Sequence, residues 1–112
     1  MLKKEFEDYE DAATGELLSM PEFQVSLVSR DSLYTASLAP VDREQVELLD
    51  EQFLSRALEV RAFVAKYGDP DIIFAEHPPQ RWWWHLPRIA AGKMSVNLRD
   101  RVVTVDQTEY SY

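Results

Sequence analysis

The spacing of apolar residues changes along the chain, and it starts with a helical pattern. Leu2, Phe6, Tyr9 and Ala13 recur at steps of three and four, which suits a short amphipathic helix ending at Thr14-Gly15. The acidic residues around them favour a terminus that docks loosely on the rest of the protein. The alternative is that residues 1–20 form an acidic arm that becomes ordered on a partner.

The pattern then becomes alternating. Phe23, Val25 and Leu27 are separated by polar residues, which is typical of a half-buried strand. Residues 29–32 are polar and resemble a turn, and residues 33–38 form a second extended stretch. Together they predict a β-hairpin that ends at Pro40.

One long helix is predicted from about Val41 to Tyr67. Asp42 and Gln45 resemble a capping box at its start, and Gly68 followed by Pro70 would stop it. Its apolar stripe consists of Val46, Leu49, Phe53, Ala57, Val60, Val64 and Tyr67. A stripe of this width favours packing across a sheet.

The last third of the chain predicts extended segments around a proline-rich loop. Residues 71–76 are apolar and β-branched and predict a short strand, with a helical turn opened by Asp69-Pro70 as the alternative. Residues 77–91 predict an ordered loop with an extended or briefly helical centre. Alternation returns at residues 94–98, and a turn at 99–101 leads to a return strand, Val102 to Val105. Residues 106–112 would lie at the sheet edge or fray.

The order of these elements predicts an α+β fold. Its simplest packing is an antiparallel sheet of four to five strands, built from two hairpins, with the one long helix packed across one face. A length of 112 residues suits one hydrophobic core, and no linker or repeat marks a boundary. We therefore expect residues 1–112 to form a single domain.

Composition narrows the classes of function. Twenty acidic against twelve basic side chains give a net charge of -8, which opposes the field of nucleic acid and makes direct nucleic-acid binding unlikely as the main role. Solubility alone explains such acidity, and a basic protein partner is the sharper interpretation. The chain has no cysteine, lacks the ~18 consecutive apolar residues of a membrane span, and shows no signal-peptide core, so we expect a cytoplasmic location.

All three tryptophans occupy consecutive positions between prolines. No backbone conformation points three successive side chains the same way, so an indole at the surface is one interpretation, and exposed indoles are frequent in binding sites. Two arginines make the segment locally basic in an acidic protein. The alternatives are indoles that close the core, or stacking on a sugar or base. The candidate binding residues are Arg81, Trp82, Trp83, Trp84, His85 and Arg88.

Evidence for catalysis is weak. Glu76, His77 and His85 carry side chains that could bind zinc or another transition metal, but their spacing matches no established motif. The isolated glycines form no nucleotide-binding loop, and nothing marks a nucleophile with its base. We therefore predict no cofactor.

These observations favour a small acidic cytosolic binding or regulatory protein that works through protein–protein interaction. Masking of a basic partner, as inhibitors, antitoxins and immunity proteins do, is the leading hypothesis. One alternative is a small metal-dependent enzyme using Glu76, His77 and His85. Another is a structural subunit of a larger complex or a homo-oligomer, in which the tryptophan segment forms the contact.

Overall fold

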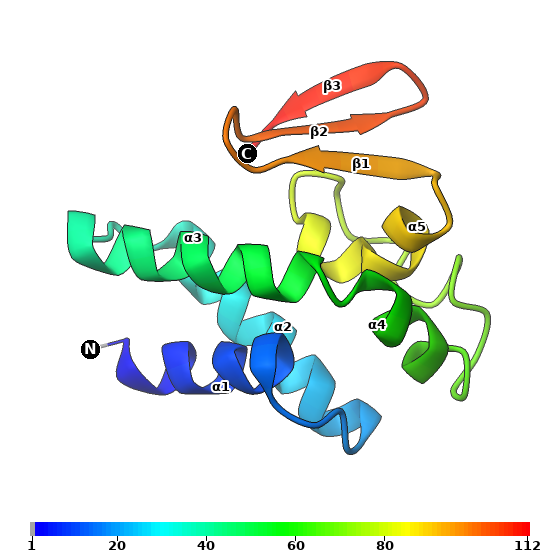
Figure 1. Cartoon of the computed structure of the whole chain (residues 1–112), viewed down its shortest axis with the longest axis horizontal. Helices are drawn as coiled ribbons and strands as arrows, with labels where there is room; N and C mark the ends of the chain where they lie inside the picture. Colours follow the sequence, from blue (N-terminus) through cyan, green and yellow to red (C-terminus); the bar gives the residue numbers. More distant parts are fainter. Residues whose placement is uncertain (1) are drawn as a thin grey trace. The chain divides into compact units, whose positions relative to one another are not determined.

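The computed structural model describes residues 2–112, which form two compact units (Figure 1). The first unit ends at Ser55, and the second comprises Arg56–Tyr112. Across residues 2–112 there are five α-helices, one 3-10 helix and one three-stranded antiparallel sheet. The predicted sheet of four to five strands with one long helix is therefore wrong. The expectation of a single domain stays a prediction.

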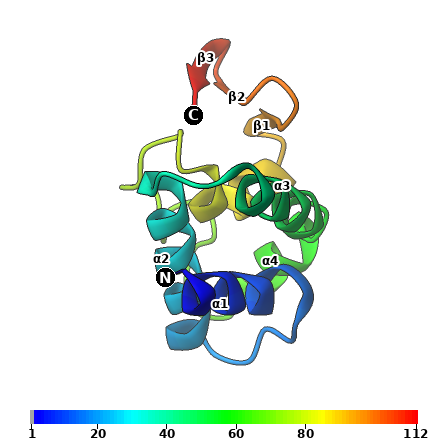
Figure 2. The same cartoon turned by 90° about the vertical axis from the view of Figure 1, so that its left-hand side faces the viewer.

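Unit 1 is helical throughout its regular elements. It consists of α1 (Lys3–Thr14), α2 (Met20–Thr35) and α3 (Pro40–Leu54), and α1 packs against both other helices. Figures 1 and 2 show α1 beside α2 from two directions. The predicted short N-terminal helix is present as α1, with Tyr9, Ala12 and Ala13 buried.

The hairpin predicted between residues 23 and 38 is wrong, because α2 occupies most of this segment. The hydroxyl of Ser19 accepts a hydrogen bond from the Glu22 backbone N–H at 3.4 Å and so caps the N-terminus of α2. Pro21 lies in the first turn, a position that favours the start of a helix. The buried face of α2 includes a charged side chain, whereas two valines lie on the exposed face. Because polar and apolar residues occur on both faces of α2, its sequence resembles the alternation of apolar and polar residues in a strand. The buried residues are Met20, Phe23, Ser26, Leu27, Ser29, Arg30 and Leu33.

The single long helix predicted from Val41 to Tyr67 is also wrong. The chain forms α3 and then a separate helix, α4 (Ala57–Val64), with a break at residues 55–56. At the break the Ser55 hydroxyl donates to the Gln52 carbonyl at 2.6 Å, a local bond that competes with helical pairing. Among the described residues no side chain caps the start of α3, so the predicted capping box does not form. The apolar stripe is nevertheless buried at Val46, Leu49, Phe53, Val60 and Val64, whereas Ala57 is half-buried and Tyr67 is exposed.

Unit 2 begins with α4 and continues through consecutive turns where a strand was predicted. The Asp69 carboxylate accepts a hydrogen bond from the Asp71 N–H at 2.9 Å, and the Asp69 carbonyl accepts from Ile72 and Ile73. A side chain that bonds its own backbone two residues on favours a turn over a strand. The briefly helical centre predicted for residues 77–91 is confirmed as η1 (Trp82–His85) and α5 (Leu86–Ala90).

The sheet of unit 2 comprises β1 (Met94–Asn97), β2 (Val102–Val105) and β3 (Thr108–Ser111) in that order. The predicted hairpin of β1 and β2 is confirmed, with Met94 opposite Val105. The segment predicted to lie at the edge or fray is the edge strand β3. Asp106 and Gln107 connect it with φ angles of 49° and 68°, the left-handed conformation that a tight two-residue hairpin turn requires.

None of the helices within residues 2–112 is long and apolar enough to cross a membrane. This agrees with the sequence, which lacks a long uncharged run.

Candidate functional site

The tryptophan segment lies inside unit 2. Trp82 and Trp83 are 0% exposed and Trp84 is 5% exposed. Trp82 meets the Tyr112 ring edge-to-face, while Trp84 stacks on the His77 ring with 3.8 Å between centroids. In this conformation the indoles offer almost no contact area to a partner. A binding role for residues 81–88 stays a prediction, and it has no exposed indole to support it.

His85 and Arg88 belong to the same packed region. His85 is 1% exposed, its Nε2 lies 2.8 Å from the His77 carbonyl oxygen, and its Nδ1 lies 3.3 Å from an Arg88 nitrogen. Because a guanidinium only donates, Nδ1 accepts and the Nε2–H donates. Burial lowers the pKa of His85, which keeps the ring neutral in this arrangement. Arg81, at the other end of the segment, is half-buried.

The three weak metal candidates do not form a shared coordination point. His77 lies flat on Trp84, with its Nε2 3.6 Å from a Glu76 carboxylate oxygen, and both ring nitrogens of His85 are engaged in the contacts above. Within residues 2–112 no group of three or more histidine, aspartate or glutamate side chains is placed to hold a metal ion. The geometry therefore does not favour the metal-dependent enzyme.

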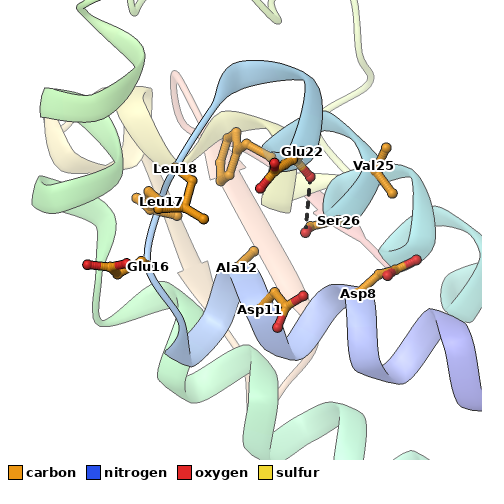
Figure 3. Close-up of a pocket in the computed structure, with 10 residues that line it drawn as sticks. Asp8, Asp11, Ala12, Glu16, Leu17, Leu18, Glu22, Val25 and Ser26 are labelled. Atoms are coloured by element: carbon orange, nitrogen blue, oxygen red, sulfur yellow. Dashed lines mark hydrogen bonds between the residues drawn. The ribbon is translucent and has the colours of Figure 1, made fainter.

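A hollow lies in unit 1, between α1 and α2 (Figure 3). We call it the acidic pocket. Its volume is about 280 Å³. Four carboxylates line it, from Asp8, Asp11, Glu16 and Glu22, together with the apolar side chains of Ala12, Leu17, Leu18, Phe23 and Val25 and the hydroxyl of Ser26.

Local sequence explains how the pocket is shaped. α1 ends at Gly15, whose N–H bonds to the Asp11 carbonyl at 2.9 Å. A Cβ added at Gly15 would meet that same carbonyl oxygen at 2.8 Å, so only glycine allows this close approach. The chain then crosses to Ser19, which caps α2. Figure 3 shows the connection forming one wall, with Asp11 on α1 and Glu22 on α2 forming two others.

Most of the negative charge in the pocket is not neutralised within the chain. Among the described residues Asp11, Glu16 and Glu22 form no ion pair. Asp8 is the exception, because it bonds to Lys4 at 2.8 Å and accepts from the Ser29 hydroxyl at 3.1 Å. The pocket is therefore a negatively charged site with apolar walls.

The arrangement suits binding and lacks the parts of an acid–base catalyst. No histidine lines the pocket, and the Ser26 hydroxyl donates to the Glu22 carbonyl of its own helix at 3.3 Å rather than to a base. A lysine or arginine side chain of a ligand would complement both the apolar walls and the negative charge of the pocket. Its methylene stem can pack on Leu18 and Val25 while its head group faces the carboxylates.

A buried polar network fixes the positions of the three helices of unit 1. Arg30 donates to the two oxygens of Asp50 at 3.0 Å each, and the Tyr9 hydroxyl donates to Asp50 at 2.6 Å. Burial raises the pKa of Tyr9 well above its usual range. Burial is the largest single influence on the pKa of Arg30 and lowers it, but the charges of Asp50 and Tyr9 and their hydrogen bonds together outweigh burial, and that pKa is raised. The network ties α1 to α2, the helices that form the pocket walls.

Sequence reasoning named none of the residues of this pocket as a site. It noted the acidic character of residues 1–20, but it did not connect Glu22 with them, because the segment after Pro21 was taken for a strand. The signal that could have found it is Ser19 followed three residues later by Glu22, a capping-box spacing that starts a helix.

Comparison of the chain with protein-family models, with curated proteins and with solved structures returned no match.

Proposed function

We propose that this protein is a small, non-catalytic binding protein that masks a basic protein partner, and that unit 1 carries the contact surface. The observation behind the proposal is the acidic pocket, in which Asp11, Glu16 and Glu22 lack a cationic partner within the described residues. Inhibition of an enzyme or neutralisation of a toxin would be instances of this function.

The distribution of charge supports the same surface. Up to Ser55 the sequence holds 13 acidic and 4 basic side chains, a net charge of -9. From Arg56 onward it holds 7 acidic and 8 basic side chains, a net charge of +1. A field concentrated on one unit accelerates the encounter with a basic partner and orients it.

The acidic pocket has a volume of about 280 Å³. It suits one arginine or lysine side chain of a partner, with Leu18 and Val25 as apolar walls.

A binding measurement with matched variants tests the proposal. The probe is a hexapeptide of alternating arginine and leucine, titrated by calorimetry into the intact protein and into D11N/E22Q. The control E44Q/E47Q removes the same charge from exposed positions of α3 outside the pocket. We expect D11N/E22Q to bind about tenfold more weakly, roughly 1.4 kcal/mol, and the control to stay within about twofold.

Two results would contradict the proposal. Equal weakening in both double variants would mean that the net charge alone attracts the peptide and that the pocket makes no specific contact. No measurable binding of the arginine peptide, or equal binding of a peptide with glutamate in place of arginine, would reject a basic partner altogether.

A further inference from the structure

We propose that the acidic pocket is one end of a longer docking groove along α2, and that its occupant is a basic amphipathic helix of the partner protein. This inference rests on the proposed function. The first observation is a second, more open hollow of about 460 Å³ that shares Asp8 and Val25 with the acidic pocket. It continues along α2 past Val28 to Ser32. We call the two hollows together the α2 groove.

An exposed apolar stripe forms the floor of the groove. Leu18, Pro21, Val25 and Val28 follow one another at steps of three, four and three, so those within α2 lie on one face of the helix. They are exposed, with Leu18 at 65%, Val25 at 50% and Val28 at 53%. The opposite face of α2 is buried in unit 1, which makes α2 a helix with two apolar faces. An apolar face without a partner in the chain is typical of an interaction surface.

Charge along the groove selects the occupant. Asp8 and Asp11 project from α1 beside the stripe, and Glu22 adds a third carboxylate from α2. Lys4 is the one cation that lines either hollow within the described residues, and Asp8 pairs with it. A helix with apolar residues toward Val25 and Val28 and lysine or arginine along its flank complements both features. This is the helix-in-groove mode of recognition.

The same charges disfavour two other occupants. An anionic membrane surface would be repelled by the carboxylates. A second copy of unit 1 has 13 acidic and 4 basic side chains of its own, so it would be repelled by the carboxylates of the groove.

The length of the apolar stripe suits a docked helix. From Pro21 to Val28 the stripe rises by about 10 Å, which matches three anchor residues at i, i+3 or i+4, and i+7 of a helix.

The test uses two synthetic peptides of identical composition. One carries leucines at i, i+3, i+4 and i+7 with arginines on the adjoining face. The other has the same residues in an order without helical amphipathicity. Fluorescence anisotropy gives the dissociation constants, and circular dichroism reports whether the peptide becomes helical on binding. We expect the amphipathic peptide to bind at least tenfold more tightly and to gain helix.

Two matched variants locate the contact. V28Q removes an exposed apolar side chain from the groove, and L48Q removes one from α3, where Leu48 is 61% exposed and outside both hollows. We expect V28Q to weaken the amphipathic peptide about fivefold and L48Q to leave it unchanged. Thermal melts of the variants without peptide should coincide with that of the parent, because both positions are exposed.

The outcomes separate this inference from the proposed function. If D11N/E22Q weakens both peptides while V28Q changes neither, and the peptides bind equally, the groove is rejected and the pocket stands. If neither peptide binds, both proposals fail. Self-association in analytical ultracentrifugation that V28Q abolishes would assign the groove to a second copy, and binding to anionic vesicles would assign it to a membrane. Either result would overturn a partner helix.

Discussion

The two units build their interiors from different chemistry. Unit 1 carries a net charge of -9 and buries an ion pair, Arg30 with Asp50, among its helices. Unit 2 carries +1 and buries three indoles and a histidine. The most conspicuous residues of the sequence therefore serve packing in unit 2. The candidate binding surface lies in unit 1, on ordinary aspartates, glutamates and valines.

The largest effect is expected from truncating the core of unit 2. Trp82→Ala removes a fully buried indole, which should lower the free energy of unfolding by about 3–5 kcal/mol, because transfer and cavity terms add. Denaturant unfolding followed by tryptophan fluorescence measures it, and this signal reports unit 2 alone, since all tryptophans lie there. A loss below about 1 kcal/mol would mean that the indole is not in the core.

The next effect concerns the buried ion pair of unit 1. Asp50→Ala leaves the Arg30 charge without its partner, and we expect a loss of about 3 kcal/mol of stability, measured by far-ultraviolet circular dichroism in denaturant. The double variant R30M/D50L removes both charges and should recover most of that loss. If the double variant were as unstable as Asp50→Ala, apolar side chains could not replace the ion pair. Unit 1 would then require a buried charge pair where unit 2 uses apolar packing.

A smaller effect is expected from the hydroxyl of Tyr9. Tyr9→Phe removes one donor to Asp50 but leaves the two bonds from Arg30, so we expect a loss of about 1 kcal/mol in the same denaturant experiment. Thr14→Ala is the control, since it removes an exposed hydroxyl that donates a hydrogen bond to the Glu10 carbonyl. It should lower the free energy of unfolding by less than Tyr9→Phe does.

The smallest effect is a dependence on acid in unit 2. Hydrogen bonds from Arg61, and then from Lys93, lower the pKa of Asp71 to about 2 from its ordinary 3.8. A carboxyl group whose pKa is lower in the folded than in the unfolded protein stabilises the fold at every pH above the unfolded-state pKa. This stabilisation is lost as the pH falls from about 4 to about 2. Asp71→Asn should therefore show a flatter melting temperature over this range than the parent. Glu109→Gln, an exposed change, should retain the parent slope.

Sequence reasoning succeeded where a pattern was local and clean. The helical spacing before Thr14, the apolar stripe of residues 46–64 and the hairpin of β1 and β2 are each specified by neighbours within a few residues. It failed at α2, where Arg30 occupies a buried position and Val25 an exposed one. A period read from polarity is misleading when a helix buries a charge and exposes an apolar face.

The candidate site was only partly accessible from sequence for the same reason. Its carboxylates come from α1, from the connection after Gly15 and from Glu22, so they form one site only when the segment after Pro21 is helical. The tryptophans were an easier signal to notice, but consecutive positions do not show which side of a segment is covered. Burial by residues such as His77 and Tyr112 decided that question.

The sequence by itself determined the net charge, the absence of cysteine, the short helix before Thr14 and the β1–β2 hairpin, because each depends on composition or on residues close in the chain. Only the tertiary structure decided that the indoles are buried, that Tyr9 contacts Asp50 from 41 positions away, and that two helices enclose an acidic pocket. These features depend on which faces the packing covers, and packing brings together residues whose separation in the chain no local pattern encodes.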